Sequence, residues 1–186
     1  MLAYVFWHWP ATGIAPAEYE RMQRAFHESL AEAGVAGLRG STSFRLDGQA
    51  PWLGGSPAYA DWYLMDGSAA LDPLNEAAVS GRRRGSHDVL AHAMGAGAGS
   101  LLQLSDAGAA ADVAGARRAT FLSKPKGMPY DPFYQRLAPV RGRDGVSLWR
   151  RQMVLGPTPE FCLLSHELLE LPPGFVALAL RLDPIA

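Results

Sequence analysis

Three side chains in the sequence are suited to acid–base chemistry, and each lies inside a run of apolar residues. His8 is the only strongly polar side chain in the opening run Leu-Ala-Tyr-Val-Phe-Trp-His-Trp, residues 2–9. Asp61 and Tyr63 share one face of a second apolar run, residues 59–65. A buried imidazole must find a hydrogen-bond partner or line a cavity. We therefore predict His8, Asp61 and Tyr63 as catalytic residues that move protons. The alternative is a histidine at a strand end that is bonded to the backbone.

Four further residues are candidates for ligand binding. Ser43 and Arg45 share the polar face of an alternating stretch, residues 40–46, and Trp7 and Trp9 supply aromatic surface beside His8. If these faces converge, Arg45 would add an anion-binding guanidinium to the acid–base pair. The alternative is that Arg45 pairs with Asp61 as a structural bridge.

The spacing of the histidines does not favour a metal site. His87 and His92 are five residues apart, which puts them about 140° apart on a helix. His27 lies off the apolar stripe of its helix, so we expect it to be exposed. We predict no metal and no cofactor. The glycine-rich residues 95–99 follow a helix and precede a strand, the reverse of a nucleotide loop, and are interpreted as a flexible helix C-cap.

Composition narrows the class of protein. The chain has 186 residues, 48% of them hydrophobic, and a formal charge of −1. This balance is typical of a globular protein and lacks the basic excess of a nucleic-acid binder. No apolar run approaches the roughly 20 residues of a membrane span. The single cysteine, Cys162, fits a reducing compartment, and the opening run is not a signal peptide, so we expect a cytoplasmic protein.

Hydrophobic periodicity predicts an α+β fold. Residues 2–9 and 59–65 are apolar on both faces, which indicates central strands of a covered sheet. Between Pro16 and Gly34, apolar residues recur every three or four positions, which predicts an amphipathic helix. Two shorter predicted helices precede a strand at 100–104. The order is strand, helix, strand, strand, helix, strand, which is the ferredoxin-like unit. In that unit the first and third strands are central, in agreement with their burial.

The rest of the chain predicts a degenerate second repeat. Residues 107–116 form a linker rich in Ala, Gly and Asp between a first unit, 1–106, and a second, 117–186. The second unit has strand candidates at 118–122, 146–155, 160–166 and 175–182, with a short helix at 130–137. The helix expected before the last strand has shrunk to residues 168–174. The alternative is an unrelated meander that extends the first sheet.

The first hundred or so residues resemble the dimeric α/β-barrel superfamily, which includes antibiotic-biosynthesis monooxygenases and the EthD-like, NIPSNAP-like and stress-responsive barrel proteins. The resemblance lies in the order of elements, in residues 59–65 leading to Ala-Ala-Leu-Asp-Pro-Leu at 69–74, and in the helix before Ser-Leu-Leu-Gln-Leu at 100–104. It implies two sheets packed face to face, with ligands between sheet and helices or inside the barrel. A second repeat would supply the partner sheet within one chain.

The resemblance implies two classes of function. One is a cofactor-independent monooxygenase or isomerase that acts on a hydrophobic or aromatic small molecule. The other is a non-catalytic ligand-binding or assembly domain. Some barrels of this superfamily bind haem, and the sequence leaves that open, although no histidine stands out as an axial ligand. The expected partners are a small hydrophobic molecule, with no nucleic acid and no membrane, and the assembly is a pseudo-dimeric monomer or a homodimer.

Overall fold

The computed structural model of the chain describes residues 1–81, 84–152 and 156–186. The elements of the first half are β1 (Leu2–Pro10), α1 (Pro16–Ala33), β2 (Leu38–Asp47), β3 (Ala58–Met65), η1 (Ser68–Ala70), α2 (Leu71–Val79), α3 (Arg84–Ala93) and β4 (Met94–Ala107). Those of the second half are β5 (Arg118–Leu122), α4 (Tyr130–Arg141), β6 (Ser147–Arg151), β7 (Phe161–Ser165) and β8 (Ala177–Pro184). No helix within the described ranges is long and apolar enough to cross a membrane.

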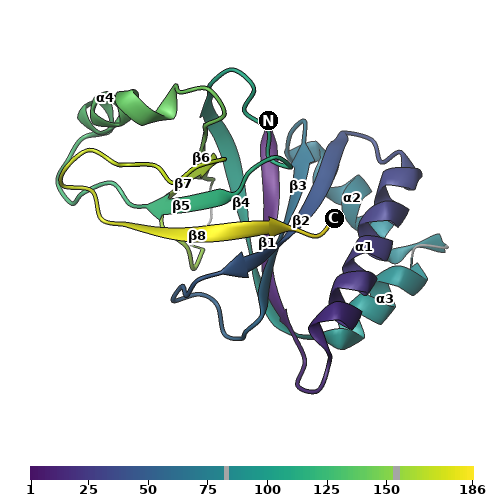
Figure 1. Ribbon diagram of the computed structural model, residues 1–186. Helices are drawn as coiled ribbons and strands as arrows, with labels where there is room; N and C mark the ends of the chain where they lie inside the picture. The colour runs from purple at the N-terminus through teal and green to yellow at the C-terminus, as the bar shows by residue number, and fades with distance from the viewer. Residues whose placement is uncertain (82–83, 153–155) are drawn as a thin grey trace.

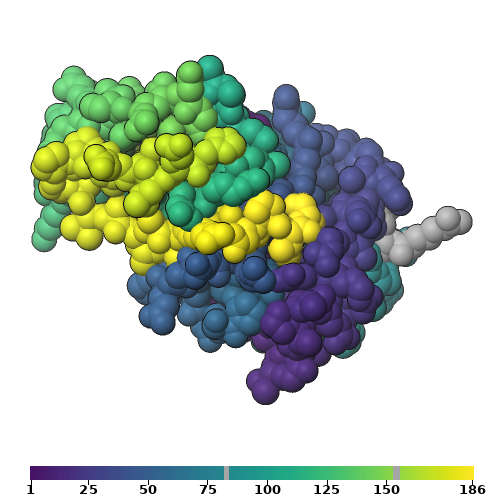
Figure 2. All heavy atoms as spheres, in the orientation of Figure 1, coloured from purple at the N-terminus to yellow at the C-terminus, as the bar shows by residue number. Residues whose placement is uncertain are grey.

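The strands form one closed antiparallel barrel in the order β1-β3-β2-β8-β5-β7-β6-β4. The first half contributes β4-β1-β3-β2, and the second half contributes its own four strands in the same relative order, β8-β5-β7-β6. Two seams join the halves, β2 with β8 and β4 with β6. The yellow strand β8 lies against the blue β2 region at one seam (Figures 1 and 2). The predicted α+β fold with a second repeat and a sheet-on-sheet core is thus confirmed, as a barrel closed within one chain.

Side chains of β1 and β3 alternate between the barrel interior and the outer face. Ala3, Val5 and Trp7 belong to the interior cluster, whereas Leu2 and Tyr4 pack with the helices. Large aromatic residues fill the interior, where the rings of Trp62 and Trp149 meet edge to face at 5.4 Å between centroids. Both strands are therefore covered on two sides, as their sequences predict.

Helices cover the outer faces of the two halves unequally. Helices α1, α2 and α3 gather on the outer face of the first half, and α4 alone lies by the second half (Figure 1). Helix α1 begins at Pro16, which suits the first helical turn, and ends before Gly34, whose φ of 58° only glycine adopts easily. In the second half, residues 166–176 take the place of a second helix, as expected from their sequence.

Two local predictions differ from the structure. Residues 95–99 are not a helix C-cap but part of β4, and residues 96–99 pair with β1. The predicted strand 146–155 is observed as β6, and residues 153–155 lie outside the described residues. Within the predicted linker, Val113 and Ala116 are buried in the interior cluster.

Candidate functional site

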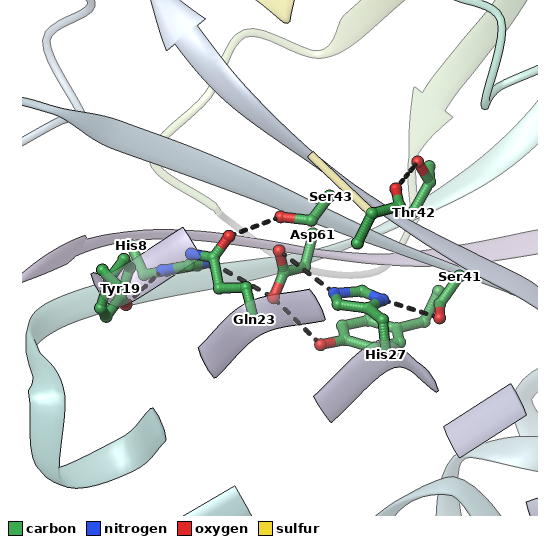
Figure 3. A network of polar contacts seen from close by, with 10 residues as sticks. His8, Tyr19, Gln23, His27, Ser41, Thr42, Ser43 and Asp61 are labelled. Carbon is green, nitrogen blue, oxygen red and sulfur yellow. Dashed lines mark hydrogen bonds and ion pairs between the residues drawn. The ribbon is translucent and has the colours of Figure 1, made fainter. Parts of the chain in front are cut away.

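The carboxylate of Asp61 lies between two imidazoles on the helix-covered face of the barrel (Figure 3). Its Oδ2 is 3.2 Å from Nε2 of His8 on β1, and its Oδ1 is 3.5 Å from Nε2 of His27 on α1. The hydroxyl of Tyr63 donates a hydrogen bond of 3.1 Å to Oδ2. Asp61 is only 2% exposed. We call these four residues the Asp61 cluster: His8, His27, Asp61 and Tyr63.

Hydroxyl groups hold the outer nitrogen of each imidazole. Nδ1 of His8 is 2.7 Å from the Tyr19 hydroxyl, and Nδ1 of His27 is 2.7 Å from Oγ of Ser41. Each hydroxyl therefore fixes the orientation of one imidazole ring toward Asp61, since the bond made by one ring nitrogen sets how the other is presented.

The chain brings the cluster together through strand register and helix periodicity. Strand β3 pairs with β1 so that Asp61 lies opposite Phe6, two pairs away from His8 and on the same face of the sheet. On α1, Tyr19, Gln23 and His27 are four residues apart and share one buried face. On this face of α1, the side-chain oxygen of Gln23 accepts a 2.9 Å hydrogen bond from the Ser43 hydroxyl of β2.

Burial and charge act in opposite directions on Asp61. Burial alone would raise the pKa of its carboxyl, but the charges of His8 and His27 outweigh burial and hold that pKa well below its usual range. Burial raises the pKa of Tyr63 well above its usual value, and the nearby Asp61 carboxylate raises it further. Tyr63 therefore remains protonated and available as a hydrogen-bond donor.

A cavity of about 520 Å³ lies on the same face and reaches Asp61 and Tyr63. This size is within the range of small-molecule sites. Two exposed residues, Asp72 and Asn75, also line it, together with the partly exposed His87. The remaining lining residues are apolar or aromatic: Tyr4, Phe6, Phe26, Leu30, Leu71, Leu74, Ala78, Leu90, Ala91 and Met94. The cavity is thus an apolar space with a buried polar end formed by Asp61 and Tyr63.

The three residues predicted as catalytic, His8, Asp61 and Tyr63, lie together in the Asp61 cluster. His27, which was expected to be exposed, is 4% exposed and completes the cluster, so that prediction was wrong. The sequence signal for it was the four-residue spacing of Tyr19, Gln23 and His27 along α1.

The four residues predicted to bind ligand lie elsewhere. Trp7 points into the barrel interior and is 1% exposed. Trp9 packs over the backbone of residues 54–55. Ser43 is bonded to Gln23, and none of the four is among the described residues that line the cavity. Arg45 does not bridge to Asp61, because it pairs with Glu20 at 3.4 Å and Asp183 at 3.6 Å near the surface.

The described residues around the cavity do not fit a haem. Asp61 and Asp72 are carboxylates, and no Lys or Arg lines the described part of the cavity to face haem propionates. Of the histidines only His87 lines the cavity, and its Nδ1 contacts the Asp88 carboxylate at 3.1 Å. Over the described ranges, no three His, Cys, Asp or Glu side chains are grouped so as to hold a metal ion.

Comparison with known proteins gives structural matches only. No protein-family model and no curated protein matches the sequence. An anthrone oxidase-like protein matches with a TM-score of 0.52 and 9% identity, over 98% of this chain and 91% of the other. A suggested monooxygenase from Lactobacillus acidophilus NCFM matches with a TM-score of 0.57 and 8% identity, over 100% and 94%.

A suggested chlorite dismutase matches with a TM-score of 0.50 and 12% identity, over 100% of this chain and 96% of the other. Identities this low establish the fold alone. Together with the closed eight-stranded barrel and its outer helices, these likenesses show that the chain has the fold of the dimeric α/β-barrel superfamily.

Proposed function

We propose that the protein is a cofactor-independent monooxygenase that binds a flat hydrophobic aromatic compound in the 520 Å³ cavity. The observation that carries this proposal is the polar end of that cavity. A carboxylate that is 2% exposed and a tyrosine hydroxyl face an otherwise apolar space. Such an arrangement can orient a substrate oxygen and accept one of its activated hydrogens.

The chemistry needs no bound group in addition to the substrate and oxygen. Asp61 takes a proton from a CH₂ group that is conjugated with a carbonyl through an aromatic ring, and the electron pair is delocalised onto the carbonyl oxygen as an enolate. Tyr63 turns its single O–H from Asp61 to the enolate oxygen, where negative charge develops. The enolate then gives electrons to O₂, and overall CH₂ and O₂ become C=O and H₂O.

The low pKa of Asp61 restricts the substrate class. A carboxylate with a lowered pKa is a weak base, so only a strongly activated hydrogen can be removed. Anthrone, the compound that appears in the name of one structural neighbour, has such a CH₂ group between two aromatic rings.

The test is the conversion of anthrone to anthraquinone by the purified protein in aerated buffer. Anthraquinone formation and O₂ uptake should be equimolar and exceed the uncatalysed rate. Asp61→Asn and Tyr63→Phe should each lower kcat by about 100-fold or more, the usual scale for an acid–base group. Asp66→Asn is the matched control, because it makes the same change in an exposed ion pair with Arg39 at the end of β3. Wild-type protein that never exceeds the uncatalysed rate would refute the proposed activity.

One observation favours a second candidate, a non-catalytic binding protein. Oδ2 of Asp61 is already contacted by both His8 and Tyr63, so the carboxylate is partly occupied without a ligand. In that case anthrone should bind under anaerobic conditions but should not be consumed faster in air.

We propose further that the chain works as a pseudo-dimeric monomer built from repeats at residues 1–106 and 117–186. The closure of the barrel within one chain supports this, because each half supplies the sheet that covers the other. A homodimer is the alternative, and sedimentation of the purified protein distinguishes the two.

A further inference from the structure

Three glycines follow one another at alternate positions of β4, directly beside the cavity wall. Gly97 pairs with His8 and Gly99 with Phe6 of β1, whereas Gly95 lies at the register shift between Ala96 and Met94. Alternate residues of a strand point to the same face. The aromatic residues Tyr4 and Phe6 of β1 line the cavity on this side.

The rings of Tyr4 and Phe6 lean across onto this glycine face. A Cβ placed on Gly99 would be 2.7 Å from the Tyr4 hydroxyl oxygen and 2.8 Å from Cε2 of the same ring. A Cβ on Gly97 would be 2.5 Å from Cζ of Phe6. Ordinary carbon contacts are about 3.5–4.0 Å, so each ring would have to move by roughly 1 Å.

The surroundings of the Tyr4 ring favour its displacement toward the cavity that it lines. On the β3 side, the Tyr4 ring meets the ring of Tyr63 at 6.0 Å between centroids, and along its own strand it meets Phe6 at 6.3 Å. The sheet lies beneath it. A Cβ at position 99 would therefore push the Tyr4 ring into the cavity.

We propose that Gly97 and Gly99 determine the size of the ligand that the cavity accepts, because they let the rings of Phe6 and Tyr4 lie back on β4. This inference rests on the proposed function only in taking the cavity as the binding site. It does not require catalysis. With these glycines the cavity accepts a fused aromatic compound. The same compound would be too large if the rings of Phe6 and Tyr4 were displaced into the cavity.

Gly99 gives the cleaner test of the two. Its three nearest atoms all belong to the Tyr4 side chain, which can move. A Cβ on Gly97 would also be 2.8 Å from the backbone oxygen of Trp7, so a larger residue there would press on β1 itself. Gly40 on β2 is the matched control, because a Cβ there meets nothing within 4 Å.

The experiment measures binding of two probes by anaerobic calorimetry: anthrone, with three fused rings, and 1-naphthol, with two. Gly99→Ala should weaken anthrone binding by roughly tenfold and naphthol binding by less than about twofold, as expected when a pocket loses space for one group. Gly40→Ala should bind both probes as wild type does. In a Tyr4→Leu background, adding Gly99→Ala should cause no further loss of anthrone binding, because the obstructing ring is gone.

The outcomes separate this inference from the proposed activity. Equal weakening of both probes, or a loss that persists in the Tyr4→Leu background, would overturn the role of the glycines. Wild-type protein that binds neither probe would overturn it as well. Selective binding without turnover in air supports the inference and refutes the monooxygenase.

Discussion

Replacing Asp61 with Asn should destabilise the protein strongly, although the two side chains have nearly the same shape. The carboxylate makes three polar contacts, with His8, His27 and Tyr63, in a site that is 2% exposed. The oxygen of Asn can take the place of Oδ2 and keep its two contacts, so Asn loses the negative charge and the contact with His27. Removing one partner of a buried ion pair costs roughly 3–5 kcal/mol, and we expect a loss of that size.

Urea unfolding at neutral pH, followed by circular dichroism, measures this loss. Asp66→Asn is the control, since its partner Arg39 is exposed and surface pairs contribute at most about 1 kcal/mol. A variant in which the cluster becomes apolar (Asp61→Val, His8→Phe, His27→Leu, Tyr19→Phe and Tyr63→Phe) should be more stable than Asp61→Asn, because the buried polar groups around Asp61 are removed together with their partner. A loss below about 1 kcal/mol for Asp61→Asn would refute the view that the network is tightly coupled.

Three further predictions concern the core, the repeat and the charge of Asp61. Trp62→Ala should cost about 3–5 kcal/mol in urea unfolding, because the side chain is fully buried against Trp149; a loss below about 1 kcal/mol would contradict its packing. A fragment of residues 1–106 should dimerise or aggregate in sedimentation experiments, since it loses the strands that close the barrel; a stable soluble monomer would argue against the two-repeat division. The ¹³C carboxyl signal of Asp61 should not titrate near pH 4, the usual range. Since its folded pKa is lowered, the stability it contributes is present above the unfolded pKa and is lost as pH falls through the folded pKa; an ordinary titration would contradict the pairing.

The fold could be predicted because the pattern of apolar residues within each short segment is enough to identify its strands and helices. Strands β1 and β3 are apolar on both faces, which marks them as central before any topology is known. The first repeat follows from the order of elements. The second repeat could be predicted in the same way even though its last helix is missing, because the strands themselves remain in order.

The site could be predicted only in part, because its partners come from different elements. His8 and Asp61 stand out as polar residues inside apolar strands. His27 does not, since a polar residue on a helix looks solvent-facing until the strand beneath it is known to carry a carboxylate. Residues 95–99 were misread for a related reason. A glycine tract can end a helix or make room for neighbouring rings, and only the pairing of β4 with β1 decides which.

Three helices cover the outer face of the first half and one helix covers the second (Figure 1), and this difference affects how many ligands each chain should bind. On the second half, Phe133, Phe161 and Leu163 pack in a closed apolar cluster where the first half has its cavity. A duplicated barrel with two equal halves would bind two ligands. This one should give a simple hyperbolic isotherm with one ligand per chain. The outer face of its second half could then change in sequence as long as it stays apolar, whereas the first half has to keep the residues of the proposed site.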